Sequence, residues 1–221
     1  MGVELIKYDP EWEALFKREA KKIKTLLGKK CCAVCHVGST AVKGLHARPI
    51  IDIMAVVECF SPIEEAKEKL FNLGYQIVPE ETDESTRMFV KGGAVAFKLV
   101  VFEKKNEAEI ARRIALRNYL RVHRDDAVKY DVLRRTLLES GVDFRTYQEK
   151  RAIFLAELEP TALLWQKRQD RHFNHLLSGI LISMGLGSLL SIAFSDFAIG
   201  MCLGLCVGVS IGFGMAFLDK R

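Results

Sequence analysis

Charge is almost absent from the last fifth of this chain of 221 residues. Between Leu176 and Leu218 the one charged residue is Asp196, whereas the chain before Leu176 is rich in Lys, Arg, Asp and Glu. The net charge of +5 therefore lies on the N-terminal part. An excess of this size suits phosphate-bearing ligands or an anionic membrane leaflet. It falls well short of the charge typical of nucleic-acid binding, so we expect no nucleic-acid partner.

Two features of secreted proteins are also missing. The start, Met1 to Glu4, lacks the basic and apolar blocks of a signal peptide. The six cysteines lie within or beside apolar runs and do not form a disulfide framework. We therefore expect reduced cysteines that pack inside a cytoplasmic domain.

The uncharged tail contains two long apolar runs, 176–194 and 197–217, separated by Ser195 and Asp196. As helices they would each reach about 28–32 Å, the thickness of a hydrocarbon core. We expect a membrane-spanning hairpin over 176–218, a juxtamembrane linker or interfacial helix over 161–175, and a soluble domain over 1–160. A buried helical hairpin of a soluble protein is the alternative.

Charges and small residues add detail to the tail. Basic residues precede the first run and follow the second, which predicts a two-pass protein with its N-terminal domain and C-terminus in the cytoplasm. Small residues recur at every fourth position, which predicts close helix packing in the manner of a glycine zipper. These stripes would join the two helices, form a homo-oligomer, or both. They comprise Gly179, Ser183, Gly187 and Ser191 in the first run, and Gly200, Gly204, Gly208 and Gly212 in the second.

The N-terminal part predicts an α+β domain, with a small mixed sheet followed by a helical half. Hydrophobic periodicity and turn residues place an opening helix to about Leu27 and a later helix over 62–73. They also predict strands over 31–37, 50–57, 75–78, 87–91 and 95–102, and helices over 107–122, 125–139 and 144–158. Six arginines recur along two of the last helices, and we expect most of them on solvated faces: Arg112, Arg113, Arg117, Arg121, Arg134 and Arg135.

Asp52 is the residue of this domain that points most directly to chemistry. It stands alone among apolar residues of a strand, where a carboxylate is costly to bury unless it is paired or binds a metal. The preceding strand ends at Gly38 and Ser39, which can bring backbone and hydroxyl groups close to a phosphate. A Gly-Ser turn beside an acidic strand is the minimal equipment of a nucleotidyltransferase, whose carboxylates hold Mg²⁺.

Several motifs of this domain resemble those of the GrpB family (UPF0157), which has a nucleotidyltransferase-like fold and a largely unestablished biochemical role. The resemblance covers roughly residues 5 to 158, and its motifs occur in the family's order. They are Tyr8-Asp9-Pro10-Glu11-Trp12 with Phe16, His36-Val37-Gly38-Ser39-Thr40-Ala41-Val42, Gly44-Leu45, Arg48-Pro49-Ile50-Ile51-Asp52-Ile53, Arg117-Asn118-Tyr119-Leu120-Arg121, and Tyr147 with Lys150.

The sequence also departs from the expected pattern. An active nucleotidyltransferase of this fold would have a second carboxylate at position 54, where this chain has Met54. Lys43 replaces a proline that is usual in the family, and Asn118 replaces an aspartate. The strand around Lys98 lacks the family's histidines. A single carboxylate cannot hold two Mg²⁺ ions with protein ligands alone, although Mg²⁺ often uses substrate phosphates and waters.

These observations favour a binding domain for a nucleotide or another phosphate-bearing small molecule, with degraded nucleotidyltransferase chemistry. An active Mg²⁺-dependent nucleotidyltransferase and an oligomerising membrane protein with a structural or signalling role are the alternatives. Asp52 and Ser39 are the candidate catalytic residues, and Asp52 is the candidate Mg²⁺ ligand. The candidate ligand-binding residues are His36, Gly38, Ser39, Thr40, Lys43, Arg48, Arg87, Lys98, Arg117 and Tyr119.

Overall fold

The computed structural model describes residues 4–218, which form two compact units that divide between Leu163 and Leu164. The first unit contains a five-stranded sheet in the order β1-β2-β5-β4-β3. Its strands are β1 (Cys31–Val37), β2 (Ile50–Val57), β3 (Gln76–Ile77), β4 (Thr86–Lys91) and β5 (Ala96–Glu103). Strands β2 and β5 are parallel, and the other neighbouring pairs are antiparallel.

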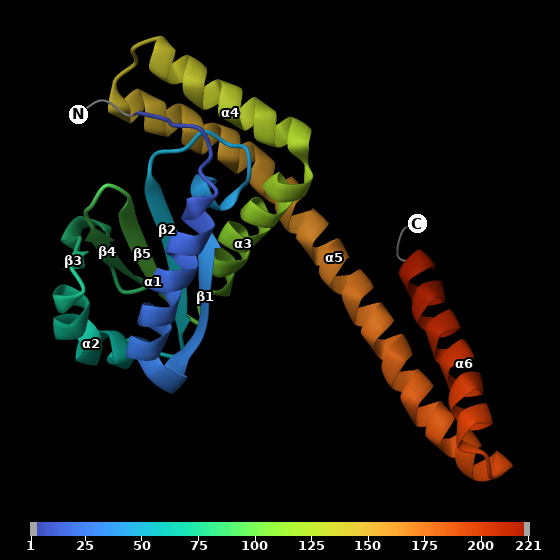
Figure 1. Cartoon of the computed structure of the whole chain (residues 1–221). Coiled ribbons are helices and arrows are strands. Elements are labelled where there is room, and N and C mark those ends of the chain that lie inside the picture. Colours follow the sequence, from blue (N-terminus) through green and yellow to red (C-terminus); the bar gives the residue numbers. More distant parts are fainter. Residues whose placement is uncertain (1–3, 219–221) are drawn as a thin grey trace. The chain divides into compact units, whose positions relative to one another are not determined.

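Helices cover both faces of this sheet (Figure 1). The helices α1 (Glu11–Leu27) and α2 (Ser61–Asn72) pack on one face, around a core that includes Trp12, Ile53 and Leu99. The helix α3 (Glu107–Val122) packs on the other face, where Met54, Val100 and other apolar side chains meet it. Because both faces are covered, β2 and β5 are apolar on both sides. Asp52 of β2 and Lys98 of β5, which lie side by side, interrupt the second face.

A helical half completes the first unit. Helix α4 (Arg124–Glu139) and the start of α5 (Phe144–Phe194) pack with the loop that precedes β2. The α+β class and the order of the elements expected from the sequence are confirmed. Strand β3 is shorter than expected: a strand was predicted over residues 75–78, and β3 contains only Gln76 and Ile77.

Helix α5 differs from the expectation of separate helices at 144–158 and 176–194. It is continuous over 51 residues and contains Pro160. Proline removes one N–H donor and usually kinks or ends a helix. Residues 161–175 are nevertheless helical, with side-chain bonds one turn apart, such as Gln166 Nε2 to Asp170 Oδ1 at 2.8 Å. The segment is thus helical, and its role as a juxtamembrane linker or interfacial helix stays a prediction.

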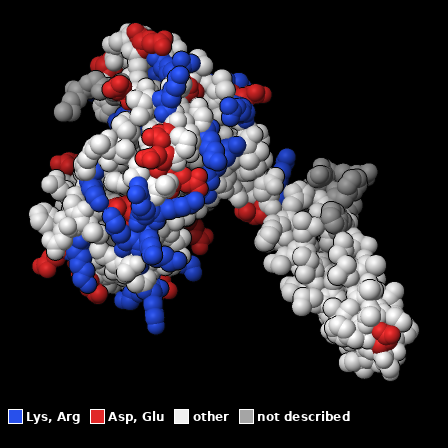
Figure 2. All heavy atoms as spheres, in the orientation of Figure 1, with Lys and Arg blue, Asp and Glu red and all other residues white. Residues whose placement is uncertain are grey.

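The second unit is a hairpin of the later part of α5 and α6 (Phe197–Leu218), and the predicted turn lies at Ser195 and Asp196. Ser195 has a φ of 52°, and Asp196 Oδ1 accepts a bond from the Ile199 N–H at 3.1 Å, which caps α6. Both helices are long and apolar enough to span a membrane. Figure 2 shows charged side chains over the first unit, while the described surface of the hairpin is almost uncharged.

The two stripes of small residues face each other within this hairpin. A Cβ atom at Gly204 would overlap the backbone of Gly187, and one at Gly208 would overlap Ser183. Only small residues allow the helices to approach this closely. The stripes therefore serve the packing of the hairpin in a single chain, and a further role between chains stays a prediction.

Candidate functional site

A cleft of about 700 Å³ lies within the first unit, where the α3 face of the sheet meets α4 and the start of α5. Its walls carry seven cationic side chains and three carboxylates. The cations are Arg48, Lys98, Arg112, Arg113, Arg117, Arg134 and Arg151, and the acids are Asp52, Glu81 and Glu159. A cleft with one dominant sign of charge focuses the field and attracts ligands of opposite charge.

The Gly-Ser turn forms one rim of the cleft. Strand β1 ends at Val37, and Gly38 then adopts a φ of 74° and a ψ of −171°, a backbone region that is essentially restricted to glycine. A short 3₁₀ turn, η2 (Ser39–Ala41), follows. A Cβ atom at Gly38 would overlap the carboxylate of Asp52. The two motifs identified in the sequence are therefore in direct contact.

Asp52 lies on β2 at the floor of the cleft, opposite Val37 of β1 and beside Lys98 of β5. Within residues 4–218 its carboxylate takes part in no hydrogen bond or ion pair. Burial raises its pKa above the ordinary value, and the nearby cations, Lys98 first, oppose that rise. Lys98 itself is paired with Glu81 at 2.8 Å. Asp52 is thus a desolvated acceptor with no protein donor.

The α3 wall brings three arginines into the cleft, and the first two are Arg112 and Arg113. Arg112 pairs with Glu109 at 2.8 Å and Glu159 at 2.5 Å. Arg113 has a longer contact of 3.8 Å with Glu109, and its guanidinium lies over the Phe102 ring, 5.2 Å from the centroid. The Nε atoms of both guanidinium groups are buried without a hydrogen-bond partner in the described chain. Burial lowers the pKa of Arg113, and the neighbouring charge of Arg112 lowers it further. Arg113 is therefore a desolvated and poorly compensated cation.

The opposite wall is held by a buried network. Asp131 of α4 accepts bonds from the backbone N–H of His46 at 2.7 Å and from its Nδ1 at 2.8 Å. Arg134 also pairs with Asp131, at 3.2 Å, and its Nε is buried without a partner in the described chain. These contacts fasten the loop that carries Arg48 to the helical half. Arg151 of α5 donates to Tyr130 Oη at 2.7 Å.

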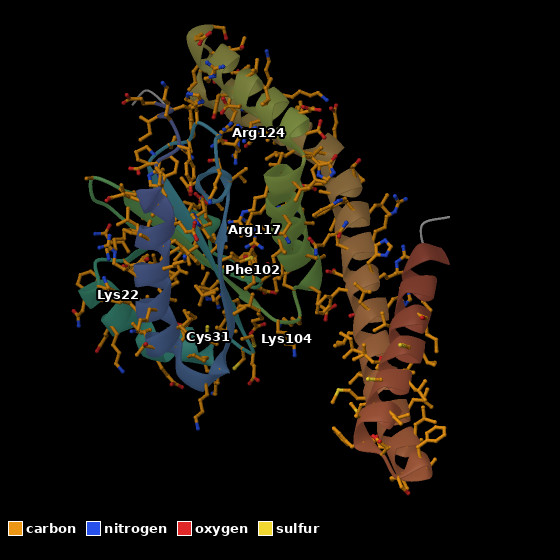
Figure 3. All side chains as sticks on the ribbon, turned by 45° about the vertical axis from the view of Figure 1, so that its right-hand side comes forward. Lys22, Cys31, Phe102, Lys104, Arg117 and Arg124 are labelled. Carbon is orange, nitrogen blue, oxygen red and sulfur yellow. The ribbon has the colours of Figure 1, made fainter. Side chains whose placement is uncertain are left out.

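Arg117 braces the turn from α3. Its Nη1 donates to the backbone oxygen of His36 at 3.0 Å, and Figure 3 shows Arg117 beside β1. Burial and the charge of Arg121 lower the pKa of Arg117. This contact fixes the end of β1 immediately before Gly38.

The structure separates the candidate residues into two groups. Gly38, Ser39, Arg48, Asp52, Lys98 and Arg117 line the cleft. The other candidates, which do not line it, are His36, Thr40, Lys43, Arg87 and Tyr119.

His36 and Thr40 support the turn from behind. The His36 ring stacks on Phe16 of α1, and its Nε2 lies 3.0 Å from Thr40 Oγ1. Burial lowers the pKa of His36 to about 4, so its ring is neutral at pH 7. Thr40 also donates to the Ile50 oxygen at 3.3 Å. Both residues hold the end of β1 to the start of β2.

The remaining candidates lie elsewhere in the unit. Lys43 is exposed, Arg87 pairs with Glu64 at 3.3 Å, and Tyr119 donates to Asp126 at 2.9 Å.

The arginines of α3 and α4 contribute more to the cleft than we predicted from the sequence. Four of the six that were expected mostly on solvated faces line the cleft: Arg112, Arg113, Arg117 and Arg134. On α3, Ile110 and Ile114 pack against the core of the sheet. Arg151, Tyr130 and Tyr147 were not proposed as ligand contacts; of these, Tyr147 belongs to a motif of the family resemblance, and no pattern in the sequence marks the other two.

A metal site has little support from the residues around Asp52. No group of three or more His, Cys, Asp or Glu side chains in the described ranges could hold a metal ion. Met54 is fully buried among Val100, Phe102 and other apolar side chains, so position 54 belongs to the core beneath α3. The cleft therefore does not fit two-metal chemistry.

Comparisons with known proteins agree with this fold. The family model described as GrpB protein matches residues 2–160. The UPF0157 protein BH1888 of Halalkalibacterium halodurans is 39% identical over 138 residues, which cover 62% of this chain and 70% of the relative. The UPF0157 protein YqkA of Bacillus subtilis is 29% identical over 169 residues, or 76% of this chain and 49% of the relative.

A crystal structure of a conserved protein GrpB from Enterococcus faecalis is also similar. It has a TM-score of 0.68 and 29% identity, and the match covers 74% of this chain and 99% of that protein.

Proposed function

This chain belongs to the GrpB family, and we propose that it is a membrane-anchored member whose cleft binds a nucleotide or another phosphate-bearing molecule. The observation that carries the proposal is a set of buried guanidinium Nε donors without partners in the described chain, at Arg112, Arg113 and Arg134. Leaving a buried charged donor unsatisfied costs more than a neutral one. Phosphate oxygens accept from arginine and would compensate these charges.

The proposal is for binding without turnover. A second metal-binding carboxylate would have to lie next to Asp52 on the same face of the sheet. The two neighbouring positions on that face are Met54 of β2 and Lys98 of β5, and neither is acidic. An active Mg²⁺-dependent nucleotidyltransferase is the second candidate, and the contact between Gly38 and Asp52 favours it. In that candidate Asp52 would hold Mg²⁺ together with phosphate oxygens and waters.

The Asp52→Asn variant distinguishes these two candidates. For metal-free binding we expect a nucleoside monophosphate to bind the variant as well as the wild type or up to about tenfold tighter, because the carboxylate repels the ligand across a few Å at an effective dielectric constant of about 20. Calorimetric titration in EDTA and in Mg²⁺ measures this. Binding that requires Mg²⁺ and disappears in Asp52→Asn would favour the nucleotidyltransferase instead.

The same variant has a pH signature in the empty protein. Because the pKa of Asp52 is raised in the fold, the contribution of Asp52 to stability falls as pH rises from acid toward neutral. Asp52→Asn should therefore unfold at a higher temperature than the wild type at pH 7, and the difference should vanish at low pH.

We propose that the hairpin of α5 and α6 anchors the chain in the membrane. Large apolar side chains point outward from both helices, including Leu181 (62% exposed), Ile192 (79%) and Phe197 (76%). Contact with lipid would remove this surface from water. The flanking basic residues support the orientation proposed from the sequence, with the first unit and the C-terminus in the cytoplasm.

Carbonate extraction of membranes tests the anchor. The full chain should remain in the pellet after alkaline and high-salt washes, because two apolar spans are held by lipid and not by charge. A chain truncated after Leu163 keeps the first unit, including the buried Ala162, and should appear in the soluble fraction. Release of the full chain by carbonate would contradict the proposal.

A further inference from the structure

Two arginines of α3, one helical turn apart, each bind a backbone carbonyl beside the Gly-Ser turn. Arg117 Nη1 donates to the oxygen of His36 at 3.0 Å, and Arg121 Nε donates to the oxygen of Ala41 at 2.8 Å. Ala41 is 5% exposed, and its oxygen accepts no other hydrogen bond from the described residues. Because one contact precedes Gly38 and the other follows Ser39, α3 holds both ends of the turn.

The turn between these contacts carries main-chain donors. Gly38 and Ser39 line the cleft, and their backbone N–H groups donate to no acceptor in the described part of the chain. Successive free N–H groups in a turn form a concavity that binds anions. Glycine has more conformational freedom than any other residue, so the shape of this turn depends on how its ends are held.

The two arginines differ in their access to a ligand. Arg117 lines the cleft, and Asn118 Oδ1 holds its guanidinium by accepting from Nε at 3.0 Å and from Nη2 at 2.8 Å. Arg121 is not among the residues that line the cleft, so its guanidinium can act on a bound ligand only through the turn.

Keeping both arginines has an electrostatic cost. Like charges four positions apart on a helix destabilise it, and the charge of Arg121 lowers the pKa of Arg117. The two hydrogen bonds to carbonyl oxygens offset this repulsion. They also cover the partial negative charges that flank a turn beside the proposed anion site.

We infer that Arg121 is a positioning residue of the phosphate site: together with Arg117 it fixes the Gly-Ser turn so that the free backbone N–H groups of the turn bind the phosphate. This inference rests on the proposed function and assigns a role to a residue outside the cleft. Arg121 acts through its hydrogen bond from Nε to Ala41, and its positive charge is secondary. Without that donor the buried carbonyl is left unsatisfied, and the turn gains freedom to rotate it toward water.

Two substitutions separate the hydrogen bond from the charge. Glutamine carries its Nε2 donor as many bonds from the backbone as arginine carries Nε, whereas methionine has no donor there. Both substitutions remove one positive charge. In calorimetric titration of AMP into the full chain in detergent with EDTA, Arg121→Met should weaken binding about tenfold, the worth of one hydrogen bond to a charged group. Arg121→Gln should stay within about threefold of the wild type, because it keeps the donor to a neutral carbonyl.

Hydrogen exchange of the turn is the readout that a merely structural role would not change. At saturating AMP the backbone amides of Gly38 and Ser39 should be protected in the wild type and in Arg121→Gln. In Arg121→Met they should exchange faster, although thermal unfolding should show the variant to be folded, because Arg121 is an exposed residue. Arg145→Met is the control for charge, since this side chain is 88% exposed, and it should bind AMP as the wild type does.

The outcomes separate this inference from the proposed function. Wild-type affinity in Arg121→Met would overturn the positioning role and leave phosphate binding intact. A tenfold loss in Arg121→Gln would by itself overturn the role, because charge would then be the cause. An equal loss in Arg145→Met would do the same. Failure of the wild type to bind AMP would overturn the inference and the proposed function together.

Discussion

Replacing Gly38 with alanine should lower the free energy of unfolding by about 3 kcal/mol, because a backbone region essentially restricted to glycine costs 1–3 kcal/mol for other residues and the new methyl group adds overlap. The overlap is with the Asp52 carboxylate, which lies against the glycine. Denaturant unfolding of the full chain in detergent, followed by tryptophan fluorescence, measures the loss.

A matched control lies in the hairpin turn between β4 and β5. A Cβ atom at Gly92 would meet nothing within 4 Å, and its φ is not positive. Gly92→Ala should therefore change stability by less than about 0.5 kcal/mol, as surface substitutions usually do. If Gly38→Ala were as mild as Gly92→Ala, the close contact between the turn and Asp52 would be wrong.

Replacing Arg113 with methionine should weaken binding of a nucleoside monophosphate about a hundredfold, because loss of one partner of a buried charge pair costs 2–5 kcal/mol. Without ligand, the Arg113→Met variant should be at least as stable as the wild type. Arg113 is a desolvated cation whose pKa is lowered, and methionine of similar volume removes its charge. Titration and thermal unfolding of the same sample report both effects.

Arg145 offers a control for this substitution. Its side chain is 88% exposed and pairs on the surface with Glu149 at 3.0 Å. Arg145→Met removes the same net charge from the first unit, so it should reproduce any effect of overall charge and no effect of the cleft. A loss of affinity that is equal in the two variants would mean that nucleotides bind through general attraction to a basic surface.

The sequence was most informative where neighbouring residues determine the geometry. Gly38 precedes Asp52 by only fourteen residues, and the antiparallel pairing of β1 with β2 brings the Gly-Ser turn and Asp52 together as expected. The same register explains why His36 misses the cleft. Val37 lies opposite Asp52 and shares its face, so His36 must point to the other face, toward α1.

The parts that sequence reasoning could not supply depend on long-range packing. His46 and Asp131 are 85 residues apart, and their contact builds the wall that carries Arg48. Arginine spacing on a helix cannot distinguish a solvated face from one that lines a cleft, because both are polar and periodic. The continuity of α5 through Pro160 was also beyond the local signal, since proline ordinarily ends a helix.

The central claim is that the cleft binds phosphate directly through its arginines. Its most direct test is calorimetric titration of AMP into the full chain in detergent with EDTA, for the wild type and Arg113→Met side by side. The account predicts saturable binding at one site per chain, weakened by salt and reduced about a hundredfold in the variant. No saturable binding by the wild type, or the same binding curve for both proteins, would contradict it.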